Sequence, residues 1–224
     1  MKLYMHPVST VSRPVTLFAA DEGIDLEPVL VDIFTGAQYG EDFLKINPSH
    51  AVPVLEDGDL CIGESSAILK YLADKTGSAA YPKDLKQRAR VNALMDWFNT
   101  GFYRSFGYNL CYSQLLDHCK LPDENAQRLV AAAGETEARQ FLDILDRHTL
   151  GRGNPYLAGN DITIADYFAS GIVSLGDVIG CTFADWPNVQ RWYRAMQARP
   201  NWEAANGALA QWADMAKGPD FVRV

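Results

Sequence analysis

The chain has 224 residues, of which 48% are hydrophobic and 21% charged, so it holds enough apolar material for a sizeable folded core. Its formal net charge is −8 and no run of Lys or Arg forms a basic patch, which excludes nucleic acid and anionic membranes as expected partners. The apolar stretches are too short to span a bilayer.

The opening residues and the cysteines indicate where such a chain resides. Residues 1–7 lack the apolar region of a signal peptide, so we expect a cytoplasmic protein. The four cysteines are scattered, without a CxxC pair or a His/Cys cluster at metal-ligand spacing. We therefore expect reduced thiols and no metal.

The first part of the chain alternates the patterns of strands and helices. Gly23 follows the first helical pattern, and Asp57-Gly58 between two short apolar runs is typical of a tight hairpin turn. The predicted elements are strand 2–5, helix 13–22, strand 26–31, helical turn 41–45, strands 54–56 and 60–62, and helix 65–75. This βαβαββα order predicts a compact α/β domain over residues 1–77.

The rest of the chain shows only helical periodicity. Residues 78–84 contain Ser78 and Pro82 and are predicted to form a linker, followed by an all-helical domain over residues 85–224. Its predicted helices are 85–116, 123–148, 164–179, 189–198 and 202–213. Thr163 is placed to cap one of them, with Asp166 reaching back to it, and we interpret this pair as structural.

The loop after the first strand carries the first candidate for chemistry. Because Pro14 cannot lie deep inside a helix, the helix is expected to begin around residues 11–13, with Ser12 as its N-cap. Ser9 then lies at the positive end of the helix dipole, where its hydroxyl can donate a hydrogen bond to an anion such as a thiolate. The alternative, a plain turn serine, is the better reading of these residues alone.

Two further segments can hold parts of a small peptide. A cis Val52–Pro53 bond would turn the backbone of Val52 outward to pair with an extended peptide, although a trans proline at a strand start is equally compatible. Ser65 is a candidate helix N-cap that can bind a carboxylate, and Glu64 can accept from an ammonium group. A simple cap beside a solvated Glu64 is the alternative.

Gln38 and His50 lie in loops beside this unit, and either side chain could donate to a second carboxylate. A lone loop histidine is more often merely exposed, so neither residue indicates a site by itself. Only the order and spacing of all these residues together indicate a single binding site.

Together these segments resemble the serine-type cytosolic glutathione transferases over almost the whole chain. Residues 46–55 (INPSHAVPVL) are similar to the signature of these classes, as are residues 57–68 and the capping segment 156–166. Residues 6–13 (HPVSTVSR) resemble the catalytic-serine segment of the phi class, whereas the placement of His50 is more like the delta and theta classes. The resemblance implies a thioredoxin-like N-terminal domain followed by a helical-bundle domain.

The resemblance also implies roles for individual residues. Ser9 would stabilise the thiolate of glutathione, the co-substrate. Six residues would bind the rest of the tripeptide: Gln38 and His50 its glycine carboxylate, Val52 beside a cis Pro53 its cysteinyl unit, and Glu64 and Ser65 its γ-glutamyl end.

The helical domain is expected to supply a pocket for a second substrate, a small hydrophobic electrophile. Aromatic residues crowd the end of its first helix, and Tyr103, Phe106 and Tyr112 are the predicted lining, with Tyr108 as a possible hydroxyl donor. At least half of these aromatics are expected to be ordinary core residues.

The expected activity is glutathione S-transfer by a homodimer. Two alternatives stay open on the sequence: a glutathione-dependent peroxidase, dehalogenase or isomerase at the same site, and a glutathione-binding interaction module without turnover.

Overall fold

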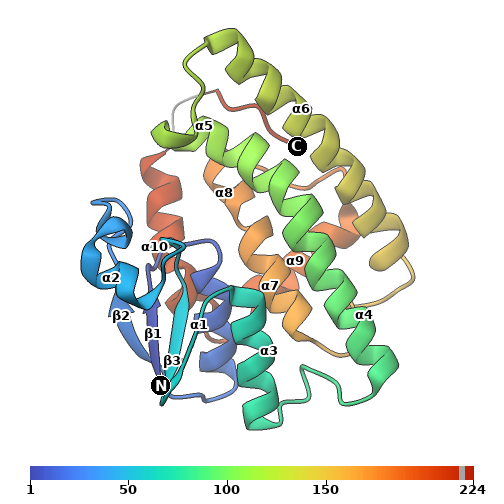
Figure 1. Ribbon diagram of the computed structural model, residues 1–224. Helices are drawn as coiled ribbons and strands as arrows, with labels where there is room; N and C mark the ends of the chain where they lie inside the picture. Colours follow the sequence, from blue (N-terminus) through green and yellow to red (C-terminus); the bar gives the residue numbers. More distant parts are fainter. Residues whose placement is uncertain (217–219) are drawn as a thin grey trace.

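The computed structural model describes residues 1–216 and 220–224. Its N-terminal part is a four-stranded sheet with helices on both faces, in the predicted order of elements (Figure 1). The elements are β1 (Lys2–Met5), α1 (Ser12–Asp21), β2 (Glu27–Leu30), η1 (Ala37–Tyr39), α2 (Glu41–Ile46), β3 (Val54–Asp57), β4 (Leu60–Ile62) and α3 (Ser65–Thr76).

The sheet has the strand order β2-β1-β3-β4, in which β1 and β2 are parallel and the other pairs antiparallel. Alternation along β1 decides which helices cover which face. Leu3 belongs to the core cluster that includes α1 and α3, whereas Tyr4 packs on the opposite face against Phe43 of α2. Gly58 has φ +63° in the turn between β3 and β4, as the predicted hairpin requires.

The remainder is helical, as predicted. Its elements are α4 (Leu85–Asp96), η2 (Trp97–Tyr112), α5 (Ser113–Leu115), η3 (Asp117–Cys119), α6 (Glu124–Ile144), η4 (Leu145–Thr149), α7 (Ile164–Val173), α8 (Leu175–Ile179), α9 (Pro187–Gln197) and α10 (Trp202–Met215). The elements α4, η2 and α5 form the one long helix expected over residues 85–116, with the wider π-helical winding in η2. The predicted helix 164–179 is divided at Ser174 into α7 and α8.

The two parts of the chain share a single core in which α1 lies against α7 (Figure 1). Arg13 of α1 is fully buried at this contact, and its guanidinium donates to Ser174 Oγ at 2.7 Å and Asn206 Oδ1 at 2.6 Å. It also donates to the carbonyl oxygen of Gly171 at 3.2 Å. These bonds fix the start of α1, and therefore the loop before it, on the helical domain.

The structure corrects both predicted serine N-caps. Ser12 and Ser65 are the first residues of α1 and α3, and the preceding residues, Val11 and Glu64, are the caps without side-chain bonds. Before α1 the hydroxyl oxygen of Ser9 accepts from the backbone N–H of Ser12 at 3.3 Å. The Ser12 hydroxyl itself is buried and has no hydrogen-bond partner among the residues that the structure describes.

The predicted contact between Thr163 and Asp166 is confirmed. Asp166 Oδ2 accepts from the backbone N–H of Thr163 at 2.8 Å, which closes a capping box at the start of α7. Among the residues that the structure describes, no helix is long and apolar enough to cross a membrane.

Candidate active site

Three of the predicted segments meet at one edge of the sheet. Strand β1 ends at Met5, and its residue Tyr4 is paired with Val54, the first residue of the antiparallel β3. Strand β4 runs back and ends at Ile62, paired with Leu55. The loop before α1, the residues before β3 and the start of α3 therefore emerge at the same edge.

Ser9 lies in a tight turn directly before α1. Its backbone N–H donates to the carbonyl of His6 at 2.9 Å, and its own carbonyl accepts from the N–H of Arg13 at 3.2 Å. The side chain is buried and its oxygen accepts from Ser12, so its hydroxyl proton is not used by that bond. Ser9 therefore keeps a hydrogen-bond donor at the positive end of the α1 dipole.

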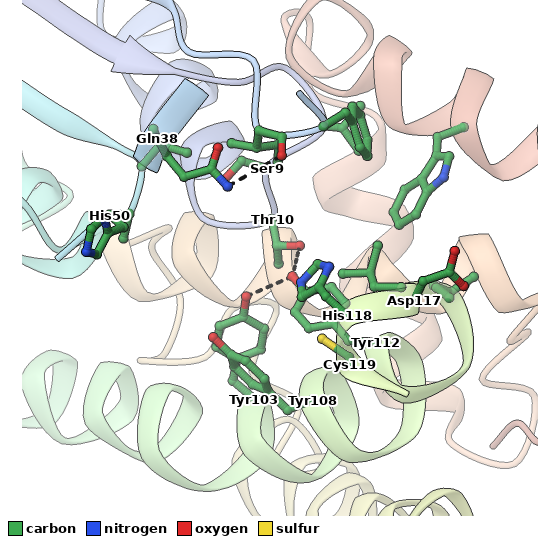
Figure 2. A pocket seen from close by; sticks show the side chains of 18 residues that line it. Ser9, Thr10, Gln38, His50, Tyr103, Tyr108, Tyr112, Asp117, His118 and Cys119 are labelled. Carbon is green, nitrogen blue, oxygen red and sulfur yellow. Dashed lines mark hydrogen bonds between the residues drawn. The ribbon is translucent and has the colours of Figure 1, made fainter. Parts of the chain in front are cut away.

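A cavity of about 560 Å³ opens between this edge of the sheet and the helical domain (Figure 2). The α/β part contributes Val8, Ser9, Thr10, Ile33, Phe34, Gln38, His50, Ala51 and Val52 to its wall. The helical part contributes Tyr103, Tyr108, Tyr112, Leu115, Leu116, Asp117, His118, Cys119 and Trp212. Both sides of the lining mix polar and apolar side chains, and the helical side is the richer in aromatic rings.

The structure places four predicted residues of the α/β part in this wall, namely Ser9, Gln38, His50 and Val52. The Val52–Pro53 peptide bond is cis, as predicted, and Pro53 is buried behind Val52. The Gln38 amide nitrogen donates to the carbonyl of Ile33 at 3.4 Å, whereas its amide oxygen is buried and has no partner within the described part of the chain. That oxygen can only accept a hydrogen bond, so a bound carboxylate would have to be held by the amide nitrogen of Gln38.

Glu64 and Ser65 are not in the cavity wall, although they lie at the same sheet edge. Ser65 is buried, and Glu64 is exposed with φ +59°. His50 also has a positive φ, of +56°. Residues other than glycine rarely adopt this conformation, and those that do are concentrated at functional sites, although Phe183 in the core is another example here.

The aromatic side of the cavity carries a chain of three hydroxyls. The oxygens of Thr10 and Tyr112 are 2.5 Å apart, and those of Tyr112 and Tyr103 are 2.8 Å apart (Figure 2). Burial raises the pKa of Tyr112 to about 12 and that of Tyr103 well above its ordinary value. Both phenols are therefore protonated at neutral pH.

Tyr103 and Tyr112 line the cavity, whereas Phe106, expected to line it with them, does not. Phe106 is fully buried and absent from the cavity wall, with its ring stacked on that of Phe102 at 4.9 Å between centroids. Tyr108, on the same helix, lines the cavity and is 53% exposed. Helical spacing alone could not separate the cavity face of η2 from its core face, because aromatics occupy both.

Several lining residues were missed on the sequence. Thr10 is adjacent to Ser9, and its position in the same loop was an available signal. Trp212 and the short η3 helix with His118 and Cys119 reach the cavity through the folding of distant segments, which no local pattern indicates. Within residues 1–216 and 220–224, no cluster of three His, Cys, Asp or Glu residues could hold a metal ion.

Comparisons with known proteins agree with this geometry. The family model of the glutathione S-transferase N-terminal domain matches residues 1–74, and that of the C-terminal domain matches residues 109–200. Human glutathione S-transferase theta-2B is 38% identical over 173 residues, which cover 75% of this chain and 68% of the relative.

Two solved structures are similar over nearly the whole chain. Human glutathione transferase theta-2, in complex with glutathione and an unknown ligand, has a TM-score of 0.83 and 30% identity, with 98% of this chain and 94% of that chain covered. A delta-class glutathione transferase from Nilaparvata lugens has a TM-score of 0.79 and 31% identity, with coverages of 96% and 98%.

Proposed function

Because this chain belongs to the glutathione S-transferase family and is a glutathione transferase with a thioredoxin-like domain followed by an all-helical domain, we propose that Ser9 activates the thiol of glutathione in the cavity. The observation that carries the proposal is the Ser9 hydroxyl, which faces the cavity with an unused proton before α1. A thiolate next to this proton gains a charge-assisted hydrogen bond and the favourable end of the helix dipole.

Both effects favour the thiolate over the thiol, so they lower the thiol pKa and raise the population of the nucleophile. The thiolate then attacks an electrophilic carbon of the second substrate. The carbon–sulfur bond forms as the leaving group departs with its electron pair. Ser9 itself forms no covalent bond in this mechanism.

The remaining predicted residues are proposed to hold the tripeptide in place. The backbone of Val52, turned by the cis bond to Pro53, is available to pair with the cysteinyl unit. Gln38 and His50 lie in the cavity wall where the glycine carboxylate would be bound. Glu64 and Ser65, at the start of α3, would bind the γ-glutamyl end just beyond the wall of this cavity.

The second substrate is proposed to be a small, largely apolar electrophile. This proposal is supported by the aromatic and aliphatic side chains of Tyr108, Leu115, Leu116 and Trp212 that face Ser9 across the cavity. Peroxidase, dehalogenase and isomerase chemistry would use the same thiolate, so a panel of substrates separates them. We also propose that the enzyme works as a cytoplasmic homodimer, which light scattering of the purified protein would test.

The role of Ser9 is tested by titrating the thiol of bound glutathione through the ultraviolet absorbance of its thiolate. We expect Ser9→Ala to raise the pKa of the bound thiol by about 1 to 2 units, because one charge-assisted hydrogen bond is lost. The matched control is Ser49→Ala, which removes an exposed hydroxyl outside the cavity wall and should leave the titration unchanged. An unchanged pKa in Ser9→Ala would remove Ser9 from this role.

A further inference from the structure

His6 shapes the turn that carries Ser9, through both its backbone and its ring. It is buried directly after β1, and its backbone carbonyl accepts from the N–H of Ser9 at 2.9 Å. Its Nδ1 accepts from the N–H of Val8 at 3.2 Å. Val8 and Ser9 both line the cavity, so His6 holds this part of the wall (residues 6–9, the Ser9 turn) from behind.

The other edge of the His6 ring faces residues 32–36, the segment between β2 and η1 that we call the Phe34 loop. Nε2 lies 3.9 Å from Asp32 Oδ1, and the ring meets that of Phe34 edge-on, with 5.1 Å between centroids. Asp32 Oδ1 in turn accepts from the N–H of Phe34 at 3.0 Å. Phe34 belongs to the cavity wall, so one imidazole lies between two segments that form this wall.

The bond to Val8 fixes the protonation state in which His6 makes these contacts. A ring nitrogen that accepts a hydrogen bond carries no proton, so the neutral ring holds its proton on Nε2, toward Asp32. Burial lowers the pKa of His6 below 6.5, with Asp32 opposing the shift, so the neutral form prevails at neutral pH. Asp32 is the charged side chain that faces the ring, since Val8 and Phe34, which also contact it, are uncharged.

Protonation would disturb this arrangement on both sides of the ring. A proton on Nδ1 places two donors against each other, because the Val8 N–H points at the same nitrogen, so the Ser9 turn has to move. The charged ring would attract the carboxylate of Asp32, which shapes the Phe34 loop through its bond to Phe34. Since the charge of the ring is matched by that of Asp32, it adds little attraction for the carboxylates of a tripeptide.

We propose that His6 is a positioning residue for glutathione, whose neutral imidazole keeps the Ser9 turn and the Phe34 loop in the shape of the cavity wall and whose protonation weakens the binding of the tripeptide. The inference rests on the proposed placement of glutathione in this cavity. His6 is not part of the cavity wall, so it acts through the residues that are. The affinity for glutathione therefore falls in mildly acidic solution, independently of the ionisation of the thiol.

The test uses S-methylglutathione, because its sulfur has no proton to lose and a change in its binding cannot come from the thiol. Isothermal titration calorimetry gives its Kd near pH 7 and near pH 5 for the native protein and for His6→Asn, whose amide oxygen can still accept from Val8 but does not titrate. We expect the ratio of the Kd at the lower pH to that at the higher pH to be about 3- to 10-fold larger in the native protein. His50 and other groups act equally in both proteins, so the comparison isolates His6.

His148→Asn is the matched control, because it removes an exposed histidine outside the cavity wall and should keep the native ratio. A purely structural role of His6 would weaken binding by the same factor at both pH values. A His6→Asn protein with weaker binding but the native ratio would therefore overturn the inference.

If His6→Asn does not fold, Asp32→Asn decides instead, because its amide oxygen keeps the bond to Phe34 while the charge that faces the ring is lost. In a pH series the midpoint of the weakening should then move to lower pH, and an unchanged midpoint contradicts the proposal. If the native protein binds S-methylglutathione but its pH dependence is insensitive to both variants, the inference alone fails. If the native protein does not bind it near pH 7, the proposed placement of glutathione fails as well.

Discussion

The indole nitrogen of Trp192 donates to Asp166 Oδ1 at 2.9 Å, which joins α9 to the start of α7 inside the core. The same carboxylate also accepts from the backbone N–H of Leu157 at 2.9 Å and from that of Thr163. The residue that the sequence identified as half of a capping box therefore holds a loop and two helices together. Since α7 packs against α1, this junction also supports the helix that follows Ser9.

Replacing this carboxylate should be costly. We expect Asp166→Ala to lower the free energy of unfolding by about 3–5 kcal/mol, because three buried N–H donors lose their acceptor at once. Urea denaturation followed by circular dichroism measures the effect. Asp161→Ala, at an exposed position of the same loop, is the control and should change stability by less than about 0.5 kcal/mol. If Asp166→Ala lowered the free energy of unfolding as little as the control does, the junction would contribute nothing to stability.

The contact between α1 and α7 depends on a glycine. A Cβ atom at Gly171 would lie 2.3 Å from Cγ of Pro14 and 2.7 Å from the carbonyl oxygen of Thr10. We expect Gly171→Ala to destabilise the fold by about 1–3 kcal/mol, because α1 must shift, and to raise KM for glutathione by moving the Ser9 loop.

The matched control for that variant is Gly207→Ala in α10. Its Cβ would meet only the flexible side chain of Glu203, at 3.1 Å, so a neutral change or a gain of up to about 1 kcal/mol is expected. Thermal denaturation and glutathione titration of both proteins give the comparison. Equal glutathione KM values in Gly171→Ala and the native enzyme would show that the contact between α1 and α7 does not position the Ser9 loop.

Stability should fall as the solution becomes mildly acidic, because of His6. The ring is buried, its Nδ1 accepts from the N–H of Val8 at 3.2 Å, and burial lowers the pKa of His6 below 6.5, with Asp32 opposing the shift. A folded-state pKa below the unfolded one means that the stabilising contribution is present above pH 6.5 and is lost as the pH falls through the folded value.

The variant His6→Asn checks this assignment. Its unfolding free energy, measured by urea denaturation across this pH range, should depend on pH less steeply than that of the native protein. Superimposable slopes for the two proteins would assign the acid sensitivity to other groups.

The sequence alone determined the order of strands and helices and the segments of the site. The strand pattern of residues 2–5, the Asp57-Gly58 turn and the helical periodicity after residue 85 are local properties, since each depends on residues within a few positions of one another. The site segments were found for the same reason. Ser9, Val52 and Glu64 each lie at the boundary of an element, where a motif of a few residues is informative.

Only the tertiary structure decided which aromatic side chains face the cavity. Phe106 and Tyr103 both lie on η2, yet the packing of η2 against other helices buries Phe106 in the core and leaves Tyr103 in the cavity wall. The bond between Thr10 and Tyr112 joins residues 102 positions apart, and the hydroxyl of Ser9 contacts the first backbone N–H of α1, at Ser12. Such contacts depend on how whole elements pack, because the periodicity of one segment does not indicate which side chains of another domain will lie against it.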